Sequence, residues 1–353
     1  MDSQEALKTL NVKKVWVPIL CGLAITGFLF YRSGKISRKI VVLLSGPNWS
    51  YLCLALLAIL LREFGHIYRL RILSNNSLSW RSCSYVALLW EFGTAVTPSV
   101  VGGGLVAIFL LSKEGLSMGR SIAYIVVTGI MDNLFFLLAC SLGLGGAYEP
   151  IFAMAGSLSS SIKGFFFMVY AFFFVYNLVM AIGVFINPNL LKWMLIYVTS
   201  IGFLKRWRRS AYQLSKDIMI TSHEFRGRTL FFWSKIFLCT FLTWMVRYIL
   251  INCFIAAYCS VSFSEHLAIL GKQVVMWALM LIPVSPGGSG IAEFWFQNFF
   301  EPMLGDYTLL IALLWRMATF YLYLILGAFL LPKWIQNSFK TKESLSAYEI
   351  GQK

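Results

Sequence analysis

The sequence has few charged residues and no extended polar segment. Only 13% of its 353 residues are charged, whereas 59% are hydrophobic, and the mean hydropathy is +0.74. An ordinary soluble domain has about 25% charged residues. This composition excludes a water-soluble globular protein of this size. The longest polar stretches, 204–229 and 332–353, are too short to form a soluble catalytic domain.

Residues that bind metals or form disulfides are also sparse. The three histidines lie far apart with no HExxH spacing, and the seven cysteines include no CxxC pair. We therefore expect no metal site, and we expect the cysteines to pack as buried small hydrophobic residues. The chain lacks a GxSxG elbow and a kinase-type phosphate loop. The sequence thus supports no known catalytic chemistry and no cofactor.

Acidic residues are half as frequent as basic ones. The chain carries 15 Asp and Glu against 30 Lys and Arg, which gives a net charge of +15. The basic excess lies mostly between the apolar runs, as is typical of membrane topology and of contact with anionic headgroups. Nucleic-acid binding is not indicated.

Long apolar runs fill most of the chain. A spanning helix needs about 20 predominantly apolar residues, and six runs meet or approach this length. We predict an all-α polytopic integral membrane protein whose single transmembrane domain occupies 1–353. The first run is expected to remain as a span because no signal-peptide cleavage pattern follows it. The six runs are 15–31, 48–62, 119–146, 164–186, 230–258 and 308–331.

Two further apolar stretches, 82–111 and 267–300, are broken by proline and glycine. Each arm has roughly 12 to 18 residues, which is short for crossing a ~30 Å hydrocarbon core. We predict two re-entrant hairpins that enter from opposite faces, as in an inverted repeat. The alternative is that these residues only kink packed helices. The breaking residues are Pro98, Gly102, Gly103 and Gly104 in the first stretch, and Pro283, Pro286, Gly287, Gly288 and Gly290 in the second.

Basic residues predict the orientation of the chain. They flank the first hairpin on both sides, which places both of its ends in the cytoplasm. The same rule places the basic amphipathic segment 187–229 and the tail 332–353 in the cytoplasm, and the ends of the second hairpin outside. It leaves the first two spans unoriented. The flanking residues are Arg62, Arg69, Arg71 and Arg81 before the hairpin, and Lys113 and Arg120 after it.

The tips of the two hairpins are candidate binding sites. In the second, a Gly-rich turn opens a helix and Glu293 follows within the first turn, so free backbone amides there could hold a phosphate. Alternatively, Glu293 caps its own helix. In the first, Ser and Thr beside unwound backbone could donate to a lipid headgroup, or the three glycines could serve only close helix packing.

Few charges lie inside the apolar runs. Each costs about 2.5 to 3.5 kcal/mol at a helix centre, so we expect them to face inward and pair. Arg247 and Arg316 are candidates for holding an anionic group, and Glu91, Asp132 and Lys272 are expected to complete a buried charge network. The alternative is a purely structural ion pair, such as Glu293 with Arg316. By contrast, Arg62, Glu63 and His66 at the end of a run are expected to be solvated.

These features favour a lipid translocase in which both hairpin tips and the buried arginines hold an anionic headgroup. Two other hypotheses remain open: a membrane-embedded lipid headgroup transferase or a subunit of one, and a non-transporting scaffold. The predicted partner is a membrane phospholipid or a lipid-linked phosphate. The predicted substrate-binding residues are Thr97, Pro98, Ser99, Gly102, Gly103, Gly104, Pro286, Gly287, Gly288, Ser289, Gly290, Glu293, Arg247 and Arg316.

Several motifs resemble those of the lysylphosphatidylglycerol synthase transmembrane-region family, also called flippase-like. They are T-P-S-V-V-G-G-G (97–104), K-E-G-L-S (113–117), the span with Asp132, I-P-V-S-P-G-G-S-G-I-A-E (282–293) and W-R (315–316). The resemblance covers nearly the whole chain.

This resemblance implies a multi-pass protein of the bacterial inner membrane. It would be related to the flippase portion of the multiple peptide resistance factor, which moves aminoacylated phosphatidylglycerol between leaflets. Many members carry an acid and an arginine just after the first Pro-x-x-x-Gly, where this chain has Gly103 and Val106. The soluble aminoacyl-transferase domain is not present in the chain, so lysyl transfer by this chain alone is not expected.

Overall fold

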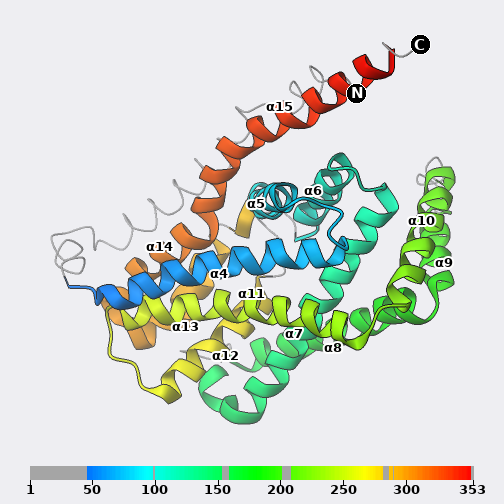
Figure 1. Cartoon of the computed structure of the whole chain (residues 1–353). Coiled ribbons are helices and arrows are strands. Elements are labelled where there is room, and N and C mark those ends of the chain that lie inside the picture. Colours follow the sequence, from blue (N-terminus) through cyan, green and yellow to red (C-terminus); the bar gives the residue numbers. More distant parts are fainter. Residues whose placement is uncertain are drawn as a thin grey trace.

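The computed structural model describes residues 46–97, 100–152, 159–200, 208–280, 286–288 and 290–350, and all regular structure in these ranges is helical (Figure 1). The long helices are α4 (Trp49–Leu73), α7 (Met118–Phe152), α8 (Ser159–Ala181), α11 (Leu230–Ala256) and α15 (Leu322–Ile350). The shorter ones are α5 (Trp80–Val96), α6 (Val100–Lys113), α9 (Pro188–Val198), α10 (Arg208–Arg226), α12 (Phe263–Leu279), α13 (Ile291–Leu304) and α14 (Thr308–Arg316).

Five stretches of the described residues are helical, long and apolar enough to cross a membrane: Trp49–Leu73, Met118–Ser141, Lys163–Ile186, Leu230–Ala256 and Ile291–Ser338. They overlap five of the six predicted runs, and the last of them also includes α13, the second arm of the second predicted hairpin. The remaining predicted span, 15–31, lies outside the described residues. The all-α polytopic membrane fold is therefore confirmed.

Helices α4 and α11 form an antiparallel pair that runs through the body of the molecule (Figure 1). The amide of Asn48, just before α4, donates to the carbonyl of Ala257 at the end of α11, at 2.7 Å. Gly65 lets the two backbones approach, because a Cβ there would lie 2.5 Å from Oγ1 of Thr243. This close packing sets which face of α4 points inward.

Each half of the fold contains one hairpin, and the two hairpins have equal arm lengths. In the first, α5 has 17 residues and α6 has 14; in the second, α12 has 17 and α13 has 14. The arms of the first pack tightly because a Cβ at Gly93 would lie 2.9 Å from the Val106 side chain. In the second, Lys272 of α12 donates to the carbonyl of Phe299 on α13, at 3.1 Å.

A helix that comes after each hairpin in the sequence packs against the hairpin of the other half. Helix α7 follows the first hairpin and packs on α12, whereas α15, which ends the chain, packs on α5. Gly327 of α15 sits so close to Phe92 of α5 that a Cβ would overlap its ring. This reciprocal packing and the antiparallel α4–α11 pair agree with the predicted inverted repeat, which stays a prediction.

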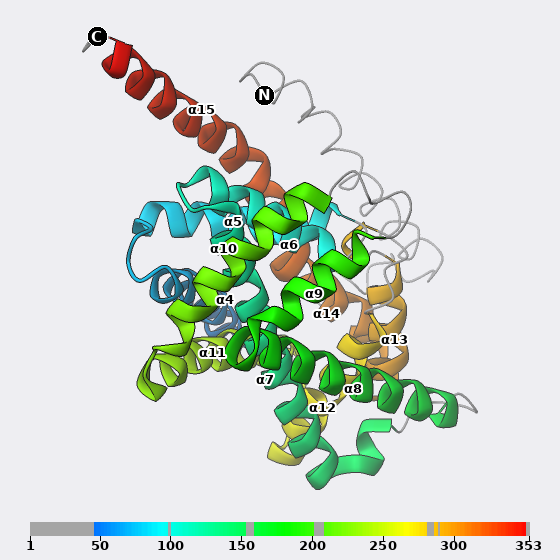
Figure 2. The same ribbon diagram turned by 90° about the vertical axis from the view of Figure 1, so that its right-hand side faces the viewer.

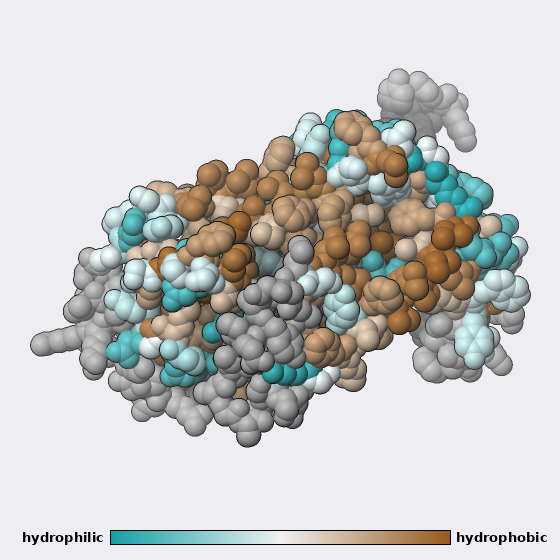
Figure 3. Space-filling model, turned by 90° about the horizontal axis from the view of Figure 1, so that it is seen from below, coloured by the Kyte–Doolittle hydropathy of each residue, from teal (hydrophilic) through white to brown (hydrophobic). Residues whose placement is uncertain are grey.

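The exposed surface is largely apolar. Figure 3 shows a broad band of hydrophobic residues across the described part of one face, with hydrophilic residues gathered toward its ends. Helices α4 and α8 each expose more large apolar side chains than any other described helix, as expected where helices face lipid. Cys53 lies exposed on α4, so the expectation that every cysteine is buried is wrong for this residue.

One local prediction is corrected by the structure. Helix α4 continues eleven residues beyond the predicted end at 62, to Leu73. Arg62 and Arg69 are therefore buried within the bundle, at 3% and 1% exposure, and are neither solvated nor flanking charges. The predicted cytoplasmic segment 187–229 contains two helices, α9 and α10, which pack side by side and lie toward the viewer in Figure 2.

Candidate functional site

The tips of the two hairpins touch. The amide of Gly287, in the turn before α13, donates weakly to the carbonyl of Thr97 at the end of α5, at 3.5 Å. Gly287 has φ +58°, and a Cβ there would lie 2.9 Å from the Ala95 carbonyl oxygen and overlap the Phe320 ring. The turn therefore requires glycine for both backbone conformation and contact. Pro98, Ser99 and Ser289, three predicted tip residues, lie outside the described residues.

Arg316 and Glu293 brace the tip of the second hairpin. The Arg316 guanidinium lies 2.9 Å from Oε1 of Glu293 through Nε, and donates to the carbonyl of Gly287 through Nη1 at 3.2 Å and Nη2 at 3.3 Å. Oε2 of Glu293 accepts the amide of Gly290 at 2.7 Å. Both structural alternatives raised for these residues, an ion pair and a capping acid, are thus present in the fold.

The glycines of the first hairpin face its other arm. A Cβ at Gly102 or Gly103 would overlap the side chain of Thr97 or Thr94 on α5, whereas at Gly104 it would make an ordinary 3.7 Å contact with Ile125. Gly102 and Gly103 therefore permit the close packing of α5 on α6. Lys272, bonded to the Phe299 carbonyl, also lies within a hairpin and forms no ion pair with any described residue.

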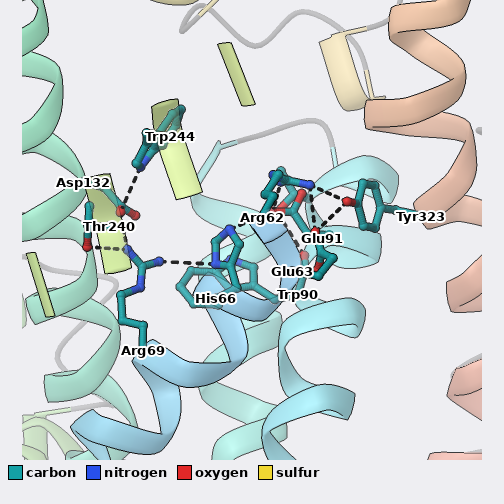
Figure 4. Close-up of polar contacts among 11 residues, drawn as sticks. Arg62, Glu63, His66, Arg69, Trp90, Glu91, Asp132, Thr240, Trp244 and Tyr323 are labelled. Atoms are coloured by element: carbon teal, nitrogen blue, oxygen red, sulfur yellow. Dashed lines mark hydrogen bonds and ion pairs between the residues drawn. The ribbon is translucent and has the colours of Figure 1, made fainter. Parts of the chain in front are cut away.

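A second polar centre lies where five helices converge, and we call it the central polar cluster (Figure 4). Its members are Arg62, Glu63, His66 and Arg69 of α4, Glu91 of α5, Asp132 of α7, Thr240 and Trp244 of α11, and Tyr323 of α15. Arg247 of α11 belongs to it too, because it lies beside Trp244 and close to Arg62 and Glu91. Glu91 is six residues before the tip residue Thr97, which is roughly 9 Å along a helix. The cluster and the tip contact are therefore neighbours along α5.

Arg62 organises one side of the cluster. Its Nη2 contacts Oε1 of Glu91, and its Nη1 donates to Oε1 of Glu63 at 3.0 Å and to the hydroxyl of Tyr323. The Tyr323 hydroxyl in turn donates to the same Glu63 oxygen, at 2.6 Å. One guanidinium thus holds two carboxylates, and Oε2 of Glu63 is buried without a hydrogen-bond partner among the described residues.

Arg69 organises the other side. Its Nη1 contacts Oδ1 of Asp132 and donates to Oγ1 of Thr240 at 2.9 Å. The indole of Trp244 also donates to Oδ1 of Asp132, at 3.0 Å. His66 lies between the two sides, with Nδ1 3.4 Å from Nη2 of Arg69 and Nε2 3.6 Å from Oε1 of Glu91 (Figure 4).

Arg247 differs from the other two arginines of the cluster. It is partly exposed and forms no hydrogen bond or ion pair with any described residue; its guanidinium carbon lies 5.4 Å from the centre of the Trp244 ring. It is close enough for its charge to act on Glu63 and Glu91. A guanidinium presents a fixed fork of donors suited to phosphate. Arg247 is therefore the arginine of the cluster that is available to a ligand.

Sequence reasoning missed most of this cluster. It ended a span at the first charge, Arg62, and so treated the following charges as flanking residues. One signal was present: positions 62, 66 and 69 fall on one face of a helix, at the i, i+4, i+7 spacing. No pattern near Tyr323 pointed to its role, because that role depends on how α15 packs across α5.

The fold and these sites define a class: a multi-pass all-α membrane protein with two glycine-tipped hairpins that meet, beside a cluster of charges inside the bundle. The chain belongs to the lysylphosphatidylglycerol synthase TM region family, whose model matches residues 15–327. It is also similar to a UPF0104 membrane protein of Archaeoglobus fulgidus. The two are 23% identical over 334 residues, which is 88% of this chain and 94% of that protein.

Proposed function

We propose that this protein moves a lipid with an anionic, phosphate-bearing headgroup between the two leaflets of a membrane. The observation that carries the proposal is Arg247, a partly accessible guanidinium in a membrane helix that bonds to no described residue. Its guanidinium donors have no hydrogen-bond partner among the described residues, and the oxygens of a headgroup phosphate can accept from them. The name of the matching family, which contains lysylphosphatidylglycerol, supports a phospholipid that carries a phosphodiester.

In this proposal the two hairpins support the site rather than bind the headgroup directly. Arg316 and Glu293 hold the second tip against the first, and Thr97, Gly102 and Gly103 keep the first hairpin closely packed. Movement of the tips relative to each other would open the central polar cluster alternately to each leaflet. The inner membrane of a bacterium, which the motif resemblance implies, is the location that suits this activity.

The test replaces Arg247 with alanine and measures the transfer of a fluorescent phosphatidylglycerol between leaflets of proteoliposomes. A hydrogen bond to a charged group contributes about 1.5 to 3 kcal/mol. Arg247→Ala should therefore weaken headgroup binding roughly ten- to hundredfold and slow transfer at limiting lipid accordingly.

Lys235→Ala is the matched control. Lys235 is a cation on the same helix, but it is exposed and stacks on Phe231 at 4.2 Å, outside the cluster. Its replacement should leave transfer unchanged. If folded Arg247→Ala protein transfers lipid as fast as the wild type, Arg247 does not hold the headgroup. If the wild type transfers no lipid, the scaffold hypothesis is the better account of the fold.

A further inference from the structure

The charges of the central polar cluster already balance without a ligand. Arg62, Arg69 and Arg247 supply three positive charges, and three carboxylates, Glu63, Glu91 and Asp132, supply three negative ones. His66 adds no charge. Its Nδ1 faces the Arg69 guanidinium, which can only donate, so this nitrogen has to accept, and the ring proton lies on Nε2 toward Glu91.

An anionic headgroup would upset this balance. A phosphodiester at Arg247 adds one negative charge close to Glu63 and Glu91, which already share Arg62. Inside a membrane protein, an uncompensated charge is far more costly than in water. Protonation of one carboxylate of the cluster compensates the negative charge of the phosphodiester.

We propose that the headgroup enters the cluster together with one proton, and that Glu63 is the residue that takes up this proton. The inference rests on the proposed function and assigns its coupling ion. The step is a simple protonation: Glu63 binds a solvent proton as the phosphate arrives and releases it as the phosphate leaves on the other side. Lipid monoanion and proton then cross together with no net charge.

Glu63 fits this role better than the groups that face it. Its Oε1 accepts from both Arg62 and Tyr323, but Oε2 is buried and accepts no hydrogen bond from the described residues. A proton on Oε2 removes the negative charge from a buried oxygen that has no hydrogen-bond partner among the described residues. Glu91 also pairs with Arg62 through Oε1, but its Oε2 is not among the buried unpartnered oxygens of the described residues.

The other titratable groups of the cluster already have partners within the protein. On its own helix, His66 is held neutral by Arg69. On α7, Asp132 is paired with Arg69 and Trp244. On α15, the Tyr323 hydroxyl donates to Glu63 itself.

The first experiment measures binding of fluorescent phosphatidylglycerol to the purified full-length protein in uncharged detergent, from mildly acidic to mildly alkaline pH. The phosphodiester stays ionised throughout, so any dependence on pH comes from the protein. Uptake of one proton per lipid makes binding tighten roughly tenfold per unit fall in pH. Glu63→Gln should remove this dependence and bind as tightly as the wild type does at low pH.

Glu224→Gln is the matched control, because Glu224 is also a carboxylate paired with an arginine but lies exposed on α10. It should keep the wild-type dependence on pH. Direct measurement of proton uptake with an indicator dye needs no variant and should give one proton per bound lipid. A pH dependence that survives in Glu63→Gln but is lost in His66→Gln would overturn the assignment to Glu63.

The second experiment imposes gradients on proteoliposomes. A pH gradient should concentrate labelled phosphatidylglycerol in the leaflet that faces the alkaline side, whereas a potassium diffusion potential at equal pH should not. Two results would refute proton coupling and leave the proposed function intact: lipid binding without proton uptake, or a distribution of the labelled lipid between leaflets that follows the membrane potential. Absence of lipid binding at every pH would refute both.

Discussion

Arg62 and Arg69 lie seven residues apart on one face of α4. Arg62 pairs with Glu91 of α5, and Arg69 pairs with Asp132 of α7. Arg62 joins α4 to α5 and α15, and Arg69 joins α4 to α7 and α11. Buried arginines of this kind fix how neighbouring helices are rotated, because any other rotation would leave charges unpaired in a low-dielectric interior. Arg247, by contrast, is left to a ligand, which is why we assign the headgroup to it.

Removal of Arg69 should be strongly destabilising. Arg69→Met leaves the Asp132 carboxylate without its cation inside the bundle, and breaking a buried pair in this way costs about 3 to 5 kcal/mol. Unfolding in mixed micelles, followed by the loss of helical circular dichroism, measures the change. Arg120→Met is the matched comparison, since its pair with Glu224 is 45% and 38% exposed and should be worth at most about 1 kcal/mol.

The double variant Arg69→Met/Asp132→Leu tests the reason for the loss. It removes both charges, so it should recover much of the stability that the single variant loses. Equal losses for Arg69→Met and Arg120→Met would show that the Arg69 side chain is not buried as the structure places it.

At the scale of elements, the helical stretch after α13 connects the two sites. Arg316, at the end of α14, holds the tip of the second hairpin, and Tyr323, in the first turn of α15, enters the central polar cluster. Between them lies a π-helical segment, Met317–Tyr321. Such segments are rare and often mark functional positions. Here it carries Phe320, which packs on Gly287 and on the Arg316 guanidinium.

The contact at the hairpin tip can be tested with two adjacent glycines. Gly287 and Gly288 both have positive φ, at +58° and +66°, so alanine strains the backbone at either position by a similar amount, about 1 kcal/mol. Only at Gly287 would the new Cβ meet Phe320 and the Ala95 carbonyl; at Gly288 no heavy atom lies within 4 Å.

We therefore expect Gly287→Ala to lower the melting temperature clearly more than Gly288→Ala, and to reduce lipid transfer. Thermal unfolding of both purified variants in the same detergent measures this difference in melting temperature. Equal melting temperatures would mean that the two tips do not pack as described.

At the scale of the whole molecule, the two halves complete each other. Helix α4 pairs with α11, α7 with α12 and α5 with α15, so most of the main helix contacts join one half to the other. Neither half can bury its inward face alone. The two hairpins have equal arm lengths, and each packs against a helix of the other half.

This interdependence predicts the behaviour of a divided chain. If the chain is cut between Ser200 and Arg208, the two fragments should assemble when they are expressed together in one membrane, and neither should be stable alone. Co-purification through a tag on one fragment, with resistance to protease, measures assembly. Independent stability of either fragment would contradict the packing of each half on the other. As a comparison, fragments from a cut inside the α5–α6 hairpin should not assemble, because this cut separates two helices that pack closely on each other.

The sequence by itself determined the membrane fold class and the five spans within the described residues, because hydropathy is read residue by residue along a helix and the bilayer thickness sets its length. It also identified two hairpins broken by proline and glycine, and the pairing of Glu293 with Arg316 as one alternative. Tertiary structure alone decided which charges meet. Partners such as Arg62 and Tyr323, 261 residues apart, are joined by the rotation and crossing of whole helices, which close contacts such as Gly65 with Thr243 fix and no local pattern encodes.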